Sequence, residues 1–216
     1  MVASGDADGA VTGNTRRFGA SLEKIKQVVD VRDGEIMFGL NMVVHKGKTI
    51  FVGDTSVHEY PTSEQMAEIA ISAARVVRLF GFEPKVAFVS HSTFGQPLTS
   101  RTKHIRTAVD ILKEKKVDFE FDGDMQPDVA LNPEYEDLYP FSNIVGKANI
   151  LIMPGQHSAA ISYKMMKTLG DTKVIGPLLI GLGLPIEIAP LRSSTSEIIN
   201  LASIAAYSAD VINYNK

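Results

Sequence analysis

Two nearly continuous apolar runs constrain the fold of this chain more than any other feature. They lie at residues 85–90 and 148–153, and each has the length of a single strand. A strand that is apolar on both faces is typical of a parallel sheet covered by helices. Segments with the 3.6-residue spacing of helices alternate with such runs along the chain. The sequence therefore predicts an α/β fold with a mostly parallel sheet flanked by helices.

The clearest predicted helix begins after Thr62, which suits an N-cap and is followed three residues later by Gln65. Apolar residues then recur at helical spacing until Gly81, where the helix is expected to end. These apolar positions are Met66, Ile69, Ala70, Ala73, Val76, Val77 and Phe80. The same spacing predicts two further helices, at about 158–169 and 194–212.

Shorter strands are predicted elsewhere in the chain. Residues 36–54 hold β-prone runs on either side of a Lys-Gly-Lys turn, which indicates a hairpin. Residues 117–122 are predicted as one strand, and residues 172–175 and 177–180 as two short strands. Such strands, spaced among helices, fit the predicted α/β class.

Composition excludes several classes of protein. The 216 residues are 44% hydrophobic, enough for a packed core, and the net charge of -3 is spread without a nucleic-acid footprint. The absence of cysteine excludes disulfide bonds, a thiolate nucleophile and a cysteine-ligated metal. No apolar run approaches the roughly 20 residues of a membrane span, and the first residues lack the pattern of a secretory signal. We therefore expect a cytoplasmic protein.

Two polar loops are predicted at the carboxyl ends of strands, where open α/β sheets bind ligands. In the first, the hydroxyls of Ser92 and Thr93 suit a phosphate or an amide, although such hydroxyls also simply turn the backbone. The second, residues 122–128, is rich in carboxylates, which are the ligands of hard cations. Its spacing does not match a calcium loop, and its acids also suit the N-terminus of the next helix. No metal site is therefore predicted.

Two basic segments are candidates for anion binding. Lys147 precedes a strand that leads into the helix predicted from about residue 158, and a helix N-terminus suits an anion. A lysine at the start of a strand is usually solvated, however. Arg16 and Arg17 leave the same two alternatives open. Paired arginines can bind phosphates, but most arginines lie on ordinary solvated surface. None of these features identifies a function by itself.

Taken in order, several segments resemble the phosphate acetyl/butyryltransferase family. They are Ala-Asp-Gly-Ala-Val-Thr-Gly at 7–13, Pro-Thr-Ser-Glu-Gln at 61–65, Ser-Thr-Phe-Gly at 92–95, Asp-Gly-Asp-Met-Gln at 122–126, Gly-Lys-Ala-Asn at 146–149 and Ile-Gly-Pro at 175–177. As an ordered set they are specific, and they cover almost the whole chain. The resemblance implies a phosphotransacetylase-like fold with an isocitrate/isopropylmalate dehydrogenase-like architecture. It also implies two domains, with CoA and acyl phosphate in the cleft between them.

The family inserts its second domain into its first. The resemblance therefore implies that residues 1–14 and 186–216 are pieces of domain one, and that residues 15–185 form domain two. The first part of domain one has no counterpart in this sequence. We accordingly expect this chain to be a fragment of a longer protein.

The departures from the family pattern fall on the residues that carry its chemistry. In the segment that resembles the family's Asn-Asp-Leu-Ser-Arg-Gly loop, Pro190 and Leu191 stand in place of the Ser and Arg. Gly155 and Ala160 stand in place of an Asp and an Asn near the acyl phosphate. Only Glu197, in place of the acid that deprotonates the CoA thiol, keeps its carboxylate. Each lost phosphate or oxyanion partner costs on the order of 10²-fold in rate, so no catalytic residue is predicted.

A closer resemblance is to the C-terminal phosphotransacetylase-like domain of the large bacterial NADP-dependent malic enzymes. It rests on Thr-Arg-Arg at 15–17, Gly-Asp-Thr-Ser-Val at 53–57 and Leu-Ala-Ser-Ile-Ala-Ala-Tyr at 201–207. It implies a module that binds acetyl-CoA as an allosteric effector and forms a homo-oligomer, a dimer or larger, through domain two. NADP and a divalent metal would belong only to the parent enzyme, because no Gly-x-Gly-x-x-Gly follows a strand here.

Three hypotheses follow. The first is a regulatory domain that binds acyl-CoA without catalysis. The second is an active phosphate acetyltransferase in which Arg192 holds the phosphate and Glu197 acts as base. The third is an assembly domain that binds no CoA. For the first hypothesis, the predicted contacts to acyl-CoA are Asn14, Thr15, Arg16, Ser92, Thr93, Lys147 and Arg192.

Overall fold

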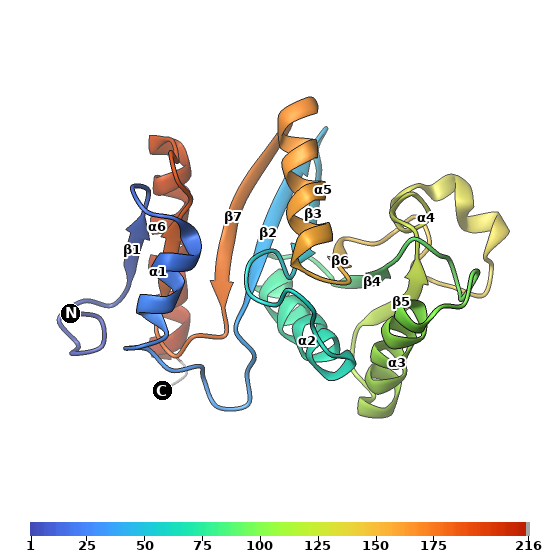
Figure 1. The fold of residues 1–216 in the computed structure, drawn as a ribbon, viewed down its shortest axis with the longest axis horizontal. Coiled ribbons are helices and arrows are strands. Elements are labelled where there is room, and N and C mark those ends of the chain that lie inside the picture. Colours follow the sequence, from blue (N-terminus) through green and yellow to red (C-terminus); the bar gives the residue numbers. More distant parts are fainter. Residues whose placement is uncertain (215–216) are drawn as a thin grey trace. The chain divides into compact units, whose positions relative to one another are not determined.

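The computed structural model describes residues 1–214 and has the α/β architecture that the sequence predicts (Figure 1). In chain order the elements are β1 (Ala10–Gly13), α1 (Phe18–Ile25), β2 (Phe38–His45), β3 (Lys48–Gly53), α2 (Ser63–Leu79), β4 (Lys85–Val89), α3 (Ser100–Lys115), β5 (Glu120–Met125), α4 (Pro127–Leu131), the 3-10 helix η1 (Pro133–Leu138), β6 (Ile150–Ile152), α5 (Gln156–Leu169), β7 (Thr172–Ile180), β8 (Ile186–Ala189) and α6 (Thr195–Tyr214). None of the helices in this described part is long and apolar enough to cross a membrane.

The strands form two sheets. One has the order β5-β4-β6-β3-β2-β7, and the other pairs β1 with β8. The pairs β4–β5, β4–β6, β3–β6 and β1–β8 are all parallel, which confirms the predicted mostly parallel sheet. The predicted hairpin is also confirmed, since β2 and β3 are neighbours joined by a two-residue turn. Neighbouring parallel strands end at the same edge of a sheet. The loops that follow these strands therefore lie next to one another along that edge.

Contacts divide the chain into two compact units. Unit 1 consists of residues 1–41 and 175–216, and unit 2 consists of residues 42–174. Strands β2 and β7 pass through this division and have residues in both units. These bounds differ from the family domains that the sequence predicts, in which domain one ends at residue 14 and resumes at residue 186. The predicted domains describe the family architecture and stay a prediction.

Helix α2 begins as the sequence predicts. The Thr62 hydroxyl accepts the N–H of Gln65 at 3.1 Å, and the Gln65 side chain accepts the N–H of Thr62 at 2.8 Å, so the capping box is complete. On the apolar face, Met66, Ile69 and Val77 are fully buried, and the helix packs on β3 and β6. Each such burial contributes about 1.5–3 kcal/mol. The predicted core face is therefore the observed one.

The predicted position of β5 was wrong. The sequence predicts a strand over 117–122, but the strand begins at Glu120 and continues to Met125. The difference arises because Lys116, which follows α3, has a left-handed conformation, after which residues 118–119 form a bend before the chain enters the sheet. As a result Asp122 and Asp124, from the carboxylate-rich segment that was expected to follow the strand, lie within the strand.

The two short strands predicted over 172–180 form one strand, β7. A Gly-Pro pair inside the segment was expected to break it. Gly176 instead allows β7 to continue close to the backbone of Leu40. A Cβ at position 176 would lie only 2.9 Å from the carbonyl oxygen of Leu40. The missing side chain therefore preserves the strand.

Unit 1 contains elements that the sequence did not predict, namely β1, β8 and α1. Strands β1 and β8 pair in parallel from Ala10 and Ile186 to Gly13 and Ala189. Their approach is close, because a Cβ on Gly13 would overlap the carbonyl oxygen of Ala189. Helices α1 and α6 both pack on this pair of strands.

Strand β8 carries a carboxyl group inside unit 1. Glu187 is only 4% exposed, and one of its oxygens accepts the backbone N–H of Leu179 at 2.9 Å. Removal from water disfavours the charged form and raises the pKa of Glu187 from 4.5 to about 8, against the smaller opposing effect of the Leu179 hydrogen bond. The carboxyl is therefore neutral in the folded chain over a range where the unfolded chain has released its proton.

Replacement of Glu187 by glutamine is expected to remove a pH dependence of stability. The folded chain keeps the Glu187 proton up to about pH 8, whereas the unfolded chain releases it near 4.5. The folded state therefore binds more protons in this window, and wild-type stability falls as the pH rises through it. A shift of this size corresponds to about 4–5 kcal/mol. Glu187→Gln retains the acceptor for Leu179, so urea unfolding should show little change at pH 5 and a gain of several kcal/mol at pH 8.5.

The matched control is Glu23→Gln on the exposed side of α1, which should alter stability little at either pH. Parallel pH profiles for wild type and Glu187→Gln would contradict the prediction.

Candidate functional site

The carboxyl ends of parallel strands in unit 2 form the first candidate surface. Strands β3, β6, β4 and β5 are parallel neighbours in that order, so they end along one edge. Helices α2, α3 and α5 each begin after a loop that leaves this edge. Open α/β sheets bind ligands at such an edge, because loops and helix N-termini converge there.

Asp124, in β5, holds the loop that follows β4. Its carboxylate is fully buried; one oxygen accepts the Ser92 hydroxyl, and the other accepts the N–H of Gly95 at 2.9 Å. The Ser92 hydroxyl also lies 3.1 Å from that of Ser90. A buried carboxylate requires such donors in place of water. The Ser92 hydroxyl, predicted to contact a ligand, is thus engaged within unit 2.

A second buried carboxylate, Asp54, organises the turn after β3. It accepts the backbone N–H groups of Ser56, Val57 and His58 at 2.8, 3.1 and 2.7 Å. A ring nitrogen of His58 lies 2.7 Å from the same carboxylate. Short polar side chains often hold turns through their own neighbouring backbone in this way. The turn carries the chain toward Tyr60 and the start of α2.

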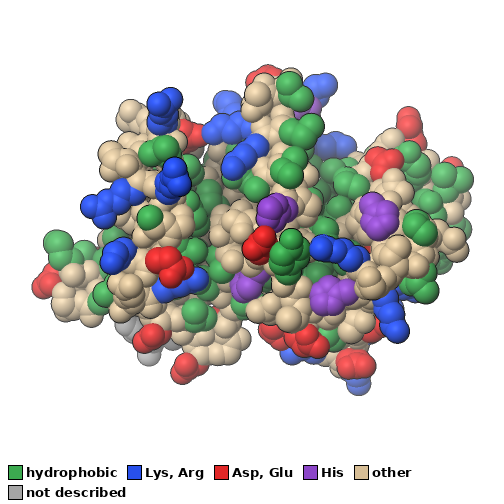
Figure 2. Space-filling view, in the orientation of Figure 1, with side chains coloured by type: hydrophobic (Ala, Val, Ile, Leu, Met, Phe, Trp, Pro, Cys, Tyr) green, Lys and Arg blue, Asp and Glu red, His purple; other side chains and the backbone are tan. Residues whose placement is uncertain are grey.

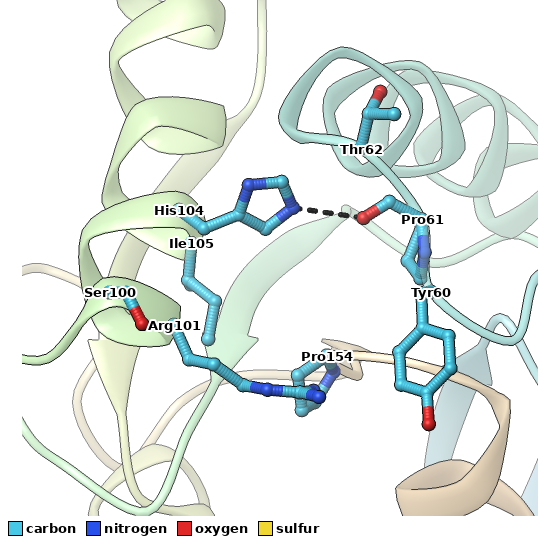
Figure 3. Close-up of a pocket in the computed structure, with 8 residues that line it drawn as sticks. All are labelled: Tyr60, Pro61, Thr62, Ser100, Arg101, His104, Ile105 and Pro154. Atoms are coloured by element: carbon cyan, nitrogen blue, oxygen red, sulfur yellow. Dashed lines mark hydrogen bonds between the residues drawn. The ribbon is translucent and has the colours of Figure 1, made fainter.

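A cavity of about 370 Å³ lies beside this turn (Figure 3). It is lined by Tyr60, Pro61, Thr62, Ser100, Arg101, His104, Ile105 and Pro154. The Arg101 guanidinium lies 5.3 Å from the centre of the Tyr60 ring, which is a cation–π contact. The His104 ring lies 2.9 Å from the Pro61 carbonyl and 2.9 Å from the Ser63 hydroxyl, so it links α3 to the start of α2. An arginine, an aromatic ring and two helix N-termini are favourable surroundings for an anionic group.

Two other predicted ligand contacts of unit 2 also have partners. The Lys147 ammonium lies 2.8 Å from the Glu136 carboxylate, in an ion pair that is partly open to solvent. The Thr93 hydroxyl accepts the N–H of Gln126 at 3.2 Å. Thr93 and Lys147, like Ser92, are therefore engaged inside unit 2, and their contact with a ligand stays a prediction.

Gly155 and Ala160, which the resemblance predicts to stand in place of catalytic residues, lie at the start of α5. A Cβ at residue 155 would overlap the carbonyl oxygen of Glu59, so the loop after β3 excludes any side chain there. Ala160 offers only a methyl group. This helix start therefore presents neither a carboxylate nor an amide at these two positions.

In unit 1 the structure brings Asn14 and Arg192 together. The N–H of Arg192 donates to the carbonyl of Asn14 at 3.2 Å, and the N–H of Asn14 donates to the carbonyl of Ala189 at 2.9 Å. Within residues 1–214, the side-chain oxygen of Asn14 is buried without a hydrogen-bond partner. Buried polar atoms without partners are rare, and each one needs an explanation. Thr15 and Arg16 follow on the same turn, exposed to solvent.

The loop from β8 to α6 holds the remaining predicted positions. The Pro190 carbonyl accepts the N–H and the hydroxyl of Ser193 at 3.1 and 2.9 Å, and the Leu191 side chain is exposed. One oxygen of Glu197 accepts the N–H and the hydroxyl of Ser194 at 2.7 and 2.9 Å, which makes a capping box at the start of α6. In this structure Glu197 caps a helix, and neither Pro190 nor Leu191 offers a polar side chain.

The sequence pointed to the carboxylates of residues 122–128 as acids at a helix N-terminus, whereas Asp124 is buried and holds the loop after β4. Neither Asp54 nor the Tyr60–Arg101 pair was predicted. A signal for the carboxylates was present, because a Gly-Asp pair ends β3 and recurs within β5, at residues 53–54 and 123–124. The Tyr60–Arg101 pair carried no local signal, since only the fold brings α2 and α3 together. Among the residues that the structure describes, no group of three acidic or histidine side chains lies close enough to hold a metal ion.

A sequence profile described as Phosphate acetyl/butaryl transferase matches residues 1–206. The chain belongs to the phosphate acetyl/butyryl transferase family. The match confirms the resemblance drawn from the order of the motifs.

Individual relatives include malic enzymes and phosphate acetyltransferases. The NADP-dependent malic enzyme of Rhizobium meliloti (strain 1021) is 47% identical over 209 residues, which are 97% of this chain and 28% of that protein. The phosphate acetyltransferase of Bacillus subtilis (strain 168) is 32% identical over 211 residues, 97% of this chain and 65% of that protein. A solved phosphotransacetylase from Streptococcus pyogenes has a TM-score of 0.90 and 30% identity, covering 96% of this chain and 64% of that one. The chain thus spans about 28% of the length of the malic enzyme that it matches.

This family fold is expected to depend on Asp124. Asp124→Ala would leave the Ser92 hydroxyl and the Gly95 N–H buried without an acceptor, and each such loss costs about 1–3 kcal/mol. Urea unfolding should therefore show a free energy of unfolding lower by about 2–5 kcal/mol. The control, Asp110→Ala, removes an exposed carboxylate paired with Lys113 and should cost under about 1 kcal/mol. Equal losses in the two variants would show that Asp124 does not hold the loop.

Proposed function

We propose that this chain is a regulatory domain that binds acyl-CoA and has lost the transferase activity of its family. The observation that carries the proposal is the loop between β8 and α6, where Pro190 and Leu191 offer no polar side chain. Acyl transfer needs donors aimed at the developing oxyanion, and removal of one such donor costs about 10²–10³ in rate. At Gly155 the backbone of Glu59 excludes a side chain altogether. Losses at both places leave little transferase activity to expect.

Acetyl-CoA is the proposed ligand, because the relatives include phosphate acetyltransferases. The turn of unit 1 offers the groups that such a ligand needs. Asn14 has a buried acceptor for an amide N–H, Thr15 has a hydroxyl, and Arg16 and Arg192 have charges for phosphate. Ser92, Thr93 and Lys147 take a secondary place in the proposal, because each has a partner inside unit 2.

The proposed setting is an NADP-dependent malic enzyme, the kind of protein to which the chain is 47% identical. Because the chain spans 28% of that relative, the conversion of malate to pyruvate, the binding of NADP and a divalent metal would belong to the rest of a parent enzyme. Acetyl-CoA would act there as an allosteric effector. Such regulation requires acetyl-CoA to bind one arrangement of the parent more tightly than another.

The alternative function is an active phosphate acetyltransferase, which the 32% identity to the Bacillus subtilis enzyme favours. In that case Arg192 would hold the phosphate and Glu197 would act as base. The carboxylate of Glu197 is committed to Ser194 at the start of α6, which argues against its service as a base. A domain that serves assembly alone would bind no acetyl-CoA.

The proposal extends to homo-oligomers formed through unit 2. Helix α5 exposes several large apolar side chains, and Figure 2 shows hydrophobic side chains gathered along it. They are Ile161, Met165, Met166 and Leu169, of which Leu169 is 81% exposed. An apolar row is complementary to a second copy of itself, as a two-fold contact between identical chains requires.

Calorimetric titration with acetyl-CoA is expected to show saturable binding that Arg16→Ala weakens about 10–100-fold. The estimate follows from the loss of a charge-assisted hydrogen bond to phosphate, worth about 1.5–3 kcal/mol. The variant should keep its unfolding midpoint, because Arg16 is exposed. Arg17→Ala is the control, since Arg17 is the exposed neighbour and is not among the predicted ligand contacts. Acetyl phosphate and CoA should give no turnover with any of these proteins.

The outcomes separate the three functions. Turnover of acetyl phosphate would establish the transferase instead. The absence of any acetyl-CoA binding would leave an assembly domain. Equal affinity in wild type and Arg16→Ala would remove Arg16 from the site.

Leu169→Ser is expected to weaken self-association, which sedimentation equilibrium measures directly. Removal of a large apolar side chain from a contact costs about 1.5–3 kcal/mol, or roughly tenfold or more in the dissociation constant. Leu138→Ser is the control, because Leu138 is an exposed leucine of the same unit on η1. A monomeric wild type, or equal effects of the two substitutions, would contradict association through α5.

A further inference from the structure

The cavity beside the Asp54 turn is lined by residues that the proposed contacts to acyl-CoA do not include. The lining residues drawn in Figure 3 all belong to unit 2, and none of them is among those contacts. The volume of about 370 Å³ lies in the range of sites for small molecules. A molecule bound in this cavity would therefore be a second ligand of the chain.

Arg101 supplies a positive charge to this cavity. Its side chain extends from α3 across the cavity towards Pro154 and Tyr60 (Figure 3). Within residues 1–214 its guanidinium has neither a hydrogen bond nor an ion pair, and it lies over the Tyr60 ring at 5.3 Å from the ring centre. A cation–π contact is an attraction between the charge and the ring face, and it engages no N–H group. The N–H donors of Arg101 are therefore free to bind an external acceptor.

No carboxylate competes for this guanidinium at the cavity wall. The lining residues, all of them in the described part of the chain, include no acid. Glu59, which precedes Tyr60, has its carboxylate 3.0 Å from a ring nitrogen of His157. The starts of α2 and α3 border the cavity, and the partial positive charge of a helix start adds to the charge of Arg101. The electrostatic potential in the cavity therefore favours an anion.

His104 lines the cavity but keeps its ring nitrogens for the fold. They lie 2.9 Å from the Pro61 carbonyl and 2.9 Å from the Ser63 hydroxyl, and both are thus engaged in joining α3 to the start of α2. The direct cationic donor to a ligand is therefore Arg101. The Ser100 hydroxyl, next to it in the chain, has no hydrogen bond to any residue that the structure describes and is a second donor.

The rest of the lining is largely apolar. Ile105 is 2% exposed, Pro61 is buried, and the Tyr60 ring and Pro154 complete the walls. An inorganic anion gains nothing from such walls, whereas the hydrocarbon part of an organic ligand is removed from water against them. The cavity thus combines one free guanidinium with apolar walls.

We propose that this cavity binds a small organic carboxylate, held by Arg101 and packed against Tyr60 and Ile105. A carboxylate carries one negative charge, and its two oxygens accept two parallel N–H bonds from the planar guanidinium. A phosphate monoester carries a charge of about -1.5 to -2 and calls for a second cationic donor. The contact with Tyr60 already restrains the guanidinium, so less side-chain freedom is lost when the ligand binds. Unit 2 thereby has a ligand of its own.

Benzoate is the probe for this site, because it joins a carboxylate to an apolar ring, and benzamide has the same shape without the charge. Each is titrated into the isotope-labelled chain, and the backbone resonances of His104 and Ile105 are followed by NMR. Benzoate is expected to give saturable shifts with a dissociation constant on the order of 1 mM, as suits a ligand of this size. Benzamide and inorganic phosphate should each bind about tenfold or more weakly, because one lacks the charge and the other the apolar body.

Arg101→Gln should weaken benzoate about tenfold or more and leave benzamide unchanged, because it removes the charge-assisted pair of hydrogen bonds. The matched control is Arg106→Gln, which removes an exposed arginine of the same helix outside the lining and should keep the wild-type affinity. Tyr60→Leu is a second variant, since it retains an apolar side chain but removes the cation–π contact, and it should weaken benzoate about threefold. All three side chains are exposed, so the unfolding midpoints should stay close to that of wild type.

Equal affinities for benzoate and benzamide, or no saturable shifts with benzoate, would overturn the carboxylate site. Inorganic phosphate that binds as tightly as benzoate would overturn the choice of a carboxylate. Equal losses of benzoate affinity in Arg101→Gln and Arg106→Gln would reveal a general effect of charge and would overturn the role of Arg101. Acyl-CoA binding is measured separately, because these variants leave the residues of unit 1 intact.

Discussion

Two buried carboxylates at the ends of strands determine the shape of unit 2. Asp54 and Asp124 are both removed from water, and each replaces it with donors from the loop that it holds. A carboxylate buried without such donors would be very costly, so once the sheet covers these groups the loops must fold around them. The turn into α2 follows from Asp54, and the closed loop after β4 follows from Asp124. The cavity beside Arg101 is bordered by the start of α2, to which the Asp54 turn leads.

The same requirement decides which polar groups remain for a ligand. In unit 2 the hydroxyl of Ser92 donates a hydrogen bond to the buried carboxylate of Asp124. The hydroxyl-rich loop after β4 therefore stabilises the fold through this bond. In unit 1 the buried side-chain oxygen of Asn14 has no hydrogen-bond partner among the described residues, and the exposed Arg16 follows on the same turn. Incomplete satisfaction of buried polar groups is unusual in a folded interior. This unsatisfied oxygen is the observation in unit 1 that supports the proposed contact between Asn14 and a ligand.

Local signals in the sequence predicted local structure well. The capping box of Thr62 and Gln65 needs only neighbouring residues, and it was predicted and observed. The register of β5 was not predictable in this way, because the burial of Asp124 depends on donors from the loop after another strand. Helix α1, at Phe18–Ile25, is too short for its periodicity to stand out. Glu187 was missed because a charged residue in a strand normally indicates a solvent face, and only the packing of unit 1 buries it. Of the site, Asn14 and Arg192 were both predicted, and the fold brings them together through a backbone hydrogen bond.

The loop after β8 is held together without the side chains of Pro190 and Leu191. The loop is held by main-chain bonds from Arg192 to Asn14 and from Ser193 to Pro190, and by the cap that Glu197 makes on α6. None of these bonds uses a side chain at position 190 or 191. The conformation of the loop therefore does not depend on hydrogen bonds from the side chains at these two positions. The glycine before Asn14 is constrained in the opposite way, because a side chain on it would overlap the neighbouring strand. The backbone path that shapes a binding turn is thus separable from the side chains that perform acyl transfer. The proposed regulatory role depends on this separation, because it needs the backbone of the binding turn but not the side chains of acyl transfer.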